Sequence, residues 1–285
     1  MPVKLAYLGV VLIWTTTPLA IKWSSEGLSY IGGVTARMSI GAICLAVILL
    51  LSRQYPPLHR KALLTYIAVS VQLYLSMLIT YWAAQFIPSG WMSVIFGLNP
   101  FMTAFLAAAF LKERSLGWRK LFSYMLGSTG LAVMCISALE LNHQALIGVI
   151  AMLVSTFVHA ISAVWVKRIH AGLPALQQIS GGMLISLPLY LLSWHYLAQD
   201  EIPLFIPDRT LYAIIYLGVI ATTLGFALYY YVLTHLAATK VALINLITPV
   251  LSLLLGHFIN QEVLSLKVMS GAGLILLALL ILQLR

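Results

Sequence analysis

Neutral polar and aromatic side chains recur three, four or seven residues apart inside the long apolar stretches of this sequence. At that spacing they would share one face of a helix. Such hydroxyl, amide, imidazole and ring groups could bind a small neutral or zwitterionic solute through hydrogen bonds and ring contacts. The candidate residues are Trp14, Thr17, Tyr74, Tyr81, Asn99, Thr103, Ser155, His159, Thr223, Tyr230, Asn245 and Thr248.

Each candidate also has a purely structural interpretation. Ser and Thr hydroxyls often hydrogen-bond helix carbonyls in membranes, and small residues let helices approach closely. Tyr and Trp near helix ends are more often interfacial anchors. That is the expectation for Trp91, Trp118, Trp194 and Tyr212.

The amide and imidazole groups are the strongest candidates for binding. Asn99 and Asn245 carry amides that must find partners in hydrocarbon. His159 is the one histidine near the centre of an apolar stretch, where it could relay protons or stay neutral and hydrogen-bonded to Ser155 or Ser162. Since no Asp or Glu lies at the same depth, we expect His159 to line a cavity rather than to carry protons.

Motifs of enzymes and of ATP-driven pumps are missing from the sequence. There is no H-E-x-x-H zinc motif, no G-x-S-x-G elbow and no G-x-x-x-x-G-K-[ST] loop. Cys44 and Cys135 lie in apolar stretches, where free cysteine behaves as a small hydrophobic residue. We therefore expect no catalytic residues, no metal site and no cofactor.

Composition places the chain in a lipid bilayer. Of 285 residues, 62% are hydrophobic and only 8% are charged, whereas an ordinary soluble domain carries about 25% charged residues. The net charge of +9 could suggest nucleic acid, but most basic residues lie in short segments between apolar stretches, so no nucleic-acid partner is expected. The first apolar stretch leads directly into others, and we expect no cleavable signal peptide.

The sequence predicts an all-α membrane protein of ten transmembrane helices. A spanning helix needs about 20 mostly apolar residues to cross a hydrocarbon core of about 30 Å. The predicted spans are Val3–Ile21, Ile31–Leu51, Leu63–Gln85, Ser89–Leu111, Leu121–Leu139, Ala145–Val166, Ala175–Tyr196, Thr210–Leu233, Val241–Phe258 and Leu266–Leu284.

Basic residues between the spans predict the orientation. Twelve of the sixteen Lys and Arg residues fall on one side: Lys4, Arg53, Arg60, Lys61, Lys112, Arg114, Arg119, Lys120, Lys167, Arg168, Lys240 and Arg285. Lys22, Arg209 and Lys267 fall on the other side, and Arg37 lies within the second span. Because cytoplasmic loops carry the excess of Lys and Arg, both termini are predicted to be cytoplasmic.

A proline and a glutamate 13 residues apart occur twice. Pro100 and Glu113 match Pro249 and Glu262 at an offset of 149, with each proline expected in the middle of a helix and each glutamate just past its end. The glutamates are expected to cap a neighbouring helix. The prolines, together with Pro18, are candidate hinges, although a fixed bend that shapes a cavity is the alternative.

The repeat divides the chain into residues 1–140 and 141–285. Five helices is an odd number, so the second copy would cross the membrane upside down relative to the first. Inverted repeats of this kind are typical of secondary transporters.

The repeat also carries a family resemblance. The segment GWMSVIFGLNPFMTAFLAAAFLKERS and its counterpart ATKVALINLITPVLSLLLGHFINQEVL each resemble the fourth helix of the EamA family of the drug/metabolite transporter superfamily. Trp14, Pro18 and Lys22 resemble its first helix, and Arg37 resembles an arginine early in its second helix. The usual glycine after the second glutamate is Gly271, whereas the first half has Ser123 with a one-residue insertion.

The resemblance implies two inverted five-helix halves around a cavity lined by helices 1, 3, 4, 6, 8 and 9, in a bacterial inner membrane. Together with the uncharged candidate residues, it predicts a secondary transporter that exports small neutral or zwitterionic metabolites, such as amino acids or amphipathic drugs, by alternating access. A channel or lipid flippase is the alternative, and a membrane-embedded enzyme is a more distant one. The partners expected are a small solute and the bilayer; the sequence is compatible with a monomer but does not fix the oligomeric state.

Overall fold

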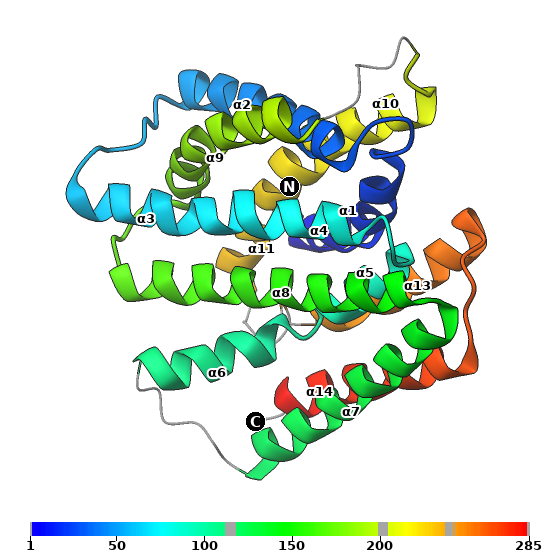
Figure 1. Cartoon of the computed structure of the whole chain (residues 1–285). Coiled ribbons are helices and arrows are strands. Elements are labelled where there is room, and N and C mark those ends of the chain that lie inside the picture. Colours follow the sequence, from blue (N-terminus) through cyan, green and yellow to red (C-terminus); the bar gives the residue numbers. More distant parts are fainter. Residues whose placement is uncertain (1, 112–117, 199–204, 237–240, 242, 284–285) are drawn as a thin grey trace.

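The computed structural model describes residues 2–111, 118–198, 205–236, 241 and 243–283, and the elements labelled in these ranges are all helices. Seven of the predicted spans are single helices: α1 (Val3–Trp23), α2 (Tyr30–Ser52), α7 (Trp118–Leu141), α8 (His143–Ile169), α9 (Ala175–Leu197), α13 (Ile244–Asn260) and α14 (Leu266–Gln283). Figure 1 shows them as a layered bundle.

The other three spans are interrupted helices. The third consists of α3 (Arg60–Ser70), the π-helix η1 (Val71–Ser76) and α4 (Met77–Ala83); the fourth consists of α5 (Ser89–Phe96) and α6 (Asn99–Leu111); the eighth consists of α10 (Asp208–Ile215), the π-helix η2 (Tyr216–Leu224) and α11 (Gly225–His235). Within the described residues, eight helical stretches are long and apolar enough to cross a membrane, and two shorter apolar helices follow them. The prediction of an all-α membrane protein of ten spans is confirmed.

Pro100 does not lie in the middle of a helix, contrary to the prediction. Helix α5 ends at Phe96 and α6 begins at Asn99, so Pro100 occupies the first turn of α6. A proline ring clashes with the carbonyl four residues earlier, which here belongs to Phe96. Pro249 and Pro18 do lie inside their helices, so the two prolines of the repeat have different local settings.

The two π-helices lie at related positions, in the third and the eighth span. A π-helix has i→i+5 backbone hydrogen bonds, is rare and frequently lies at functional sites. In η1, Tyr190 of α9 donates hydrogen bonds to the carbonyls of Leu73 (2.7 Å) and Tyr74 (3.1 Å). In η2, the hydroxyls of Thr222 and Thr223 donate to carbonyls five residues earlier, at 2.8 and 3.1 Å. Each π-helix is therefore held by side-chain hydrogen bonds.

Contacts between the helices are reciprocal. Helix α1, the first span, packs on α13, the ninth span. Its counterpart in the second half is α8, the sixth span, which packs on α6 of the fourth span. In the same way α2 packs on η2 while α9 packs on α3, and α2 also packs on α9. Figure 1 shows α2 and α9 side by side. The first and last five spans thus contact each other through matching helices.

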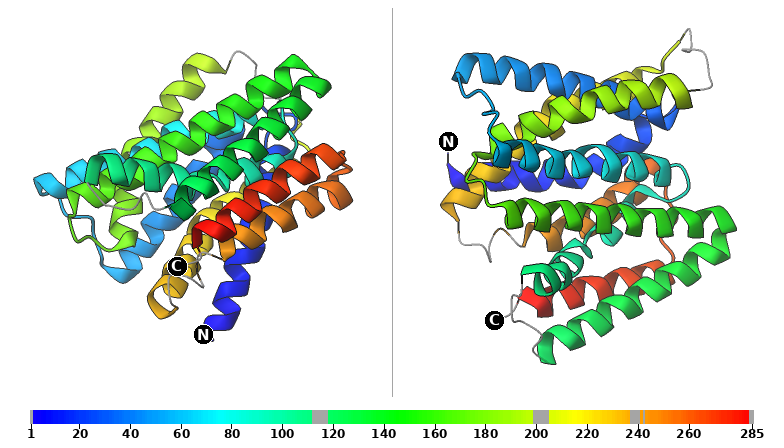
Figure 2. Two further views of the ribbon diagram at one scale, coloured as in Figure 1. Left: turned by 90° about the horizontal axis from the view of Figure 1, so that it is seen from below. Right: turned by 60° about the vertical axis from the view of Figure 1, so that its left-hand side comes forward.

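Helices α7 and α14 pack closely and lie side by side in both views of Figure 2. A Cβ atom added to Gly130 would lie 2.6 Å from the carbonyl oxygen of Gly271, and one added to Gly271 would lie 2.9 Å from that of Gly130. Only glycine fits such a distance, and small residues commonly allow this packing between membrane helices.

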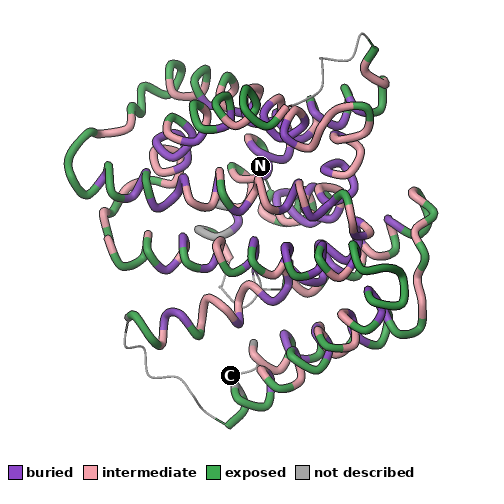
Figure 3. Tube along the Cα trace, viewed as in Figure 1, coloured by how far each residue is buried: buried purple, intermediate pink, exposed green. Residues whose placement is uncertain are grey.

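Large apolar side chains cover the outside of the bundle. Ile43, Leu12 and Phe105 expose 61–64% of their surface. The buried residues lie where helices face one another, as Figure 3 shows by colour. An apolar outer surface suits a lipid environment, in which exposed apolar side chains do not contact water and so carry no solvation penalty.

Candidate functional site

Helix α1 meets the second half of the chain through polar and aromatic contacts. The hydroxyls of Thr16 and Tyr216, a residue of η2, lie 2.5 Å apart. The Trp14 ring lies 4.9 Å from the ring of Tyr229 in α11. Thr17 is half-buried and donates to the carbonyl of Ile13 at 2.6 Å. The predicted residue Trp14 therefore lies beside α11, while Thr17 follows directly after the residue of α1 that contacts η2.

A second polar connection joins three helices. The Ser93 hydroxyl in α5 donates to the Ser252 hydroxyl in α13 at 2.9 Å, and Ser252 donates to the carbonyl of Thr15 in α1 at 2.7 Å. Ser93 was not among the predicted site residues. The spacing of Ser252 from Thr248 was the one signal in the sequence that pointed to this contact.

The predicted tyrosines of the third span have different environments. Tyr74 is half-buried; its hydroxyl lies 2.5 Å from that of Ser193, and its ring contacts the edge of Tyr190 at 5.0 Å. Tyr81 is fully buried, and its hydroxyl accepts a hydrogen bond from Ser24 at 3.4 Å. Of the two, Tyr74 has the accessible surface that a binding role requires.

His159 has no hydrogen bond to Ser155 or Ser162 in the described structure, so the alternative of a pairing with these serines does not hold. The hydroxyl of Ser155 bonds to Ser76 and Thr80 in the third span, and Ser162 donates to the carbonyl of Ala68. Both serines therefore join α8 to that span. The His159 ring contacts Phe96 edge-on at 4.9 Å, and its Nδ1 is buried without a partner among the described residues.

The remaining candidates lie on the fourth, eighth and ninth spans. Asn99 accepts a hydrogen bond from Thr103 at 3.3 Å, and both are half-buried. Asn245 is half-buried and Thr248 is 8% exposed. Thr223 lies in η2, and the side chain of Tyr230 lies outside the described part of the structure.

Glu262 caps a helix of the other half. Its carboxylate accepts hydrogen bonds from the backbone N–H groups of Ser89 (2.9 Å) and Gly90 (3.3 Å), at the start of α5. A carboxylate at a helix N-terminus satisfies free N–H groups and complements the helix dipole. The capping prediction is confirmed for Glu262, while Glu113 lies outside the described residues.

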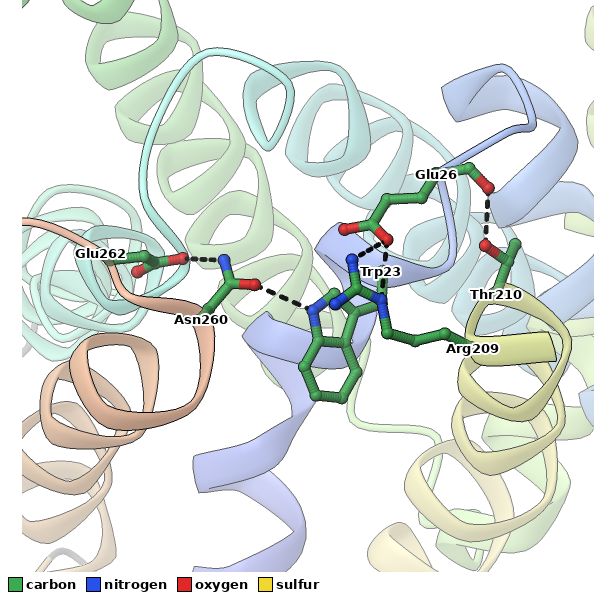
Figure 4. Close-up of polar contacts among 6 residues, drawn as sticks. All are labelled: Trp23, Glu26, Arg209, Thr210, Asn260 and Glu262. Carbon is green, nitrogen blue, oxygen red and sulfur yellow. Dashed lines mark hydrogen bonds and ion pairs between the residues drawn. The ribbon is translucent and has the colours of Figure 1, made fainter. Parts of the chain in front are cut away.

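Further polar contacts cluster at this end of the bundle. Asn260 donates to Glu262 at 2.9 Å and accepts from the indole nitrogen of Trp23 at 3.1 Å. Glu26 forms an ion pair with Arg209, whose guanidinium lies 5.1 Å from the Trp23 ring centre. We call Trp23, Glu26, Arg209, Thr210, Asn260 and Glu262 the polar latch; Figure 4 shows it joining α1, α10 and α13.

Arg37 is buried in α2, with 4% of its surface exposed. Its Nε donates to the hydroxyl of Thr222 in η2 at 3.2 Å, whereas its Nη1 has no partner among the described residues.

A separate pocket of about 320 Å³ lies between α6, α7 and α8. Its lining is mostly apolar and consists of Leu98, Phe101, Met102, Phe105, Tyr124, Gly127, Ser128, Leu131 and Phe157. None of the predicted site residues lines it, so it is distinct from the polar contacts around α1.

Three relatives of the chain are named as transporters or as an efflux pump. An "Uncharacterized transporter" of Archaeoglobus fulgidus is 29% identical and covers 95% of both chains; "Uncharacterized transporter YoaV" of Bacillus subtilis is 23% identical and covers 96% of this chain and 94% of its own. A "Probable amino-acid metabolite efflux pump" of Salmonella typhimurium is 27% identical over 68% of this chain and 67% of its own. A solved structure titled "Crystal structure of protein" shares the fold, with a TM-score of 0.64, 18% identity and coverage of 98% of this chain and 96% of its own.

The helical architecture and these relatives define a multi-pass membrane transporter. The profile of the EamA-like transporter family matches residues 2–136 and again residues 146–284. The chain belongs to this family.

Proposed function

We propose that this protein is a secondary transporter that exports small neutral or zwitterionic metabolites, such as amino acids or amphipathic drugs, by alternating access. Its two halves are residues 1–140 and 141–285, related by an inverted repeat, with both termini in the cytoplasm of a bacterium and the helices in its inner membrane.

The repeat is supported by three independent features. The family profile matches once in each half. Helices of the two halves pack reciprocally, as α1 on α13 and α8 on α6. A π-helix interrupts the third span of each half. Since each half contains five spans, copies of one unit must have opposite orientations in the bilayer.

The observation that carries the proposed substrate class is the chemistry of the half-buried candidates. They are neutral polar or aromatic: Trp14, Thr17, Tyr74, Asn99, Thr103, His159, Thr223 and Asn245. The described carboxylates lie elsewhere, at helix ends such as Glu262 or in exposed ion pairs such as Glu140 with Lys267. This lining suits uncharged or zwitterionic solutes, because a bare cation would require a charged partner.

Alternating access requires contacts that can close one end of the pathway. The polar latch supplies them at one end of the bundle, because Trp23 and Glu26 of the first half bond to Asn260 and Arg209 of the second. In the predicted orientation this end faces away from the cytoplasm. An exporter loads its substrate while that end is closed.

Transport into inside-out vesicles tests the proposal. Vesicles that contain the protein are expected to accumulate labelled hydrophobic amino acids or amphiphilic dyes, and Asn99→Ala or Asn245→Ala should reduce the rate at least about tenfold if the lost amide is a substrate contact worth about 1.5 kcal/mol. Gln54→Ala, which removes an exposed amide outside the helices, serves as the control. Absence of flux for every solute of both classes would refute the proposed function.

A further inference from the structure

The unusual feature of Arg37 is a buried charge with nearly all of its hydrogen-bonding capacity unused. A guanidinium carries five N–H donors and stays protonated in proteins. In Arg37, which is 4% exposed, the Nε hydrogen has an acceptor in Thr222, whereas Nη1 is buried without one. Unpaired donors on a permanent charge are costly in a membrane interior.

No described carboxylate neutralises this charge. Glu26 pairs with Arg209, Glu140 pairs with Lys267, Glu262 caps α5, and Asp208 is exposed in the first turn of α10. Removing one partner of a buried ion pair is strongly destabilising, because the other charge is left uncompensated. A cation held in this way has unused capacity to bind an anion.

The surroundings of Arg37 connect it to the proposed substrate pathway. Thr222, which accepts the hydrogen bond from Arg37, belongs to η2, and so does Tyr216. The Tyr216 hydroxyl in turn bonds to Thr16 on α1, next to the candidate residue Thr17. Separation of α1 from η2 would break this hydrogen bond and uncover part of η2, the helix that accepts the hydrogen bond from Arg37.

We infer that Arg37 binds the carboxylate of the transported solute, so that the substrates are carboxylate-bearing zwitterions rather than cationic amphiphiles. This inference rests on the proposed transport function. A planar guanidinium matches a carboxylate with two parallel charge-assisted hydrogen bonds. Arg37 carries one positive charge and its hydrogen-bond partner is a hydroxyl group, so the site suits a solute group with a single negative charge.

The test compares acids with their amides in proteoliposomes. The probes are phenylalanine, leucine and methionine, the three corresponding amino-acid amides, and the cationic dye ethidium. Wild-type protein should transport the acids at least about tenfold faster than the amides, since hydrogen bonds to a charged group contribute about 1.5–3 kcal/mol. Arg37→Gln should abolish that preference and Arg37→Lys should retain part of it. Arg53→Gln, at the exposed end of the same helix, should leave the preference unchanged.

The outcomes separate this inference from the proposed function. Equal transport of acids and amides, transport of ethidium alone, or an unchanged preference in Arg37→Gln would overturn the carboxylate site and leave an exporter of neutral or amphipathic solutes. No transport of any probe would overturn both. If Arg37→Gln does not fold, thermal stabilisation of the wild-type protein by each acid but not by its amide provides the same discrimination.

Discussion

The carboxylate of Glu262, just past the ninth span, receives the first backbone N–H groups of the fourth span, at Ser89 and Gly90. A residue of the second half thereby completes a helix of the first. Glu262→Gln should lower the stability of the detergent-solubilised protein by about 1–2 kcal/mol, because the N-cap loses its charge while the amide keeps one acceptor. Thermal unfolding measures the loss.

Glu140→Gln is the matched control for that substitution. Glu140 and Lys267 form an exposed ion pair, and exposed pairs contribute only about 0–1 kcal/mol. Equal losses in the two variants would contradict the capping role of Glu262.

Two glycines of one helix should respond oppositely to the same change. A Cβ at Gly271 would press on the backbone of α7, whereas a Cβ at Gly273 would meet no atom within 4 Å. Gly271→Ala should therefore destabilise the protein by about 1–3 kcal/mol through overpacking, while Gly273→Ala should be neutral or stabilising by up to about 1 kcal/mol through helix propensity. Thermal unfolding in parallel measures both, and a stable Gly271→Ala variant would show that α7 and α14 do not cross at this pair.

Weakening the polar latch should shift the protein toward the state that is open at that end. Trp23→Phe keeps an aromatic ring at this position but removes the indole N–H that donates to Asn260. The loss of a hydrogen bond worth about 1 kcal/mol changes the ratio of the two populations about fivefold. The readout is the labelling rate of Thr17→Cys by an impermeant thiol reagent from the latch side, with Cys44 and Cys135 replaced by Ser.

Trp118→Phe is the control for the latch experiment, since Trp118 is 77% exposed at the far end of α7. The alternating-access proposal predicts faster labelling in Trp23→Phe alone. An unchanged rate in that variant would mean that the latch is a static feature of the fold.

The inverted repeat predicts that Glu113 and Glu262 lie on opposite faces of the membrane. Single cysteines at these two positions, in the same background without native cysteines, should react with an impermeant reagent from the cytoplasmic side and from the opposite side respectively. Both cysteines reacting from one side would disprove the inversion.

The ten spans were predictable because apolar length alone identifies a membrane helix. Capping by Glu262 was predictable too, since a carboxylate just past a helix end, repeated at the same distance from a proline, has few other uses. The position of Pro100 was not predicted correctly, because whether a proline bends a helix or starts a new one depends on backbone packing around the preceding turn.

The partners of polar residues were harder to predict than their presence. Ser155 and His159 share a helix spacing, yet Ser155 bonds to Ser76 on the third span and His159 contacts Phe96 on the fourth. Helical periodicity places residues on a face but does not say which neighbour that face meets. The π-helices were missed for a related reason: their extra residue per turn leaves no composition signal, and the hydrogen bonds from Tyr190 come from a distant segment.

The contact between Gly130 and Gly271 restricts how the two halves can move. Two backbones that touch at a pair of residues without side chains cannot slide along each other by even one residue, because the next side chain would collide with the opposite helix. Tilting about that point remains possible. Helices α7 and α14, the fifth and tenth spans, would then form the pivot of the motion. A small rotation at this pivot would produce a larger displacement at the distant ends of α1 and α8.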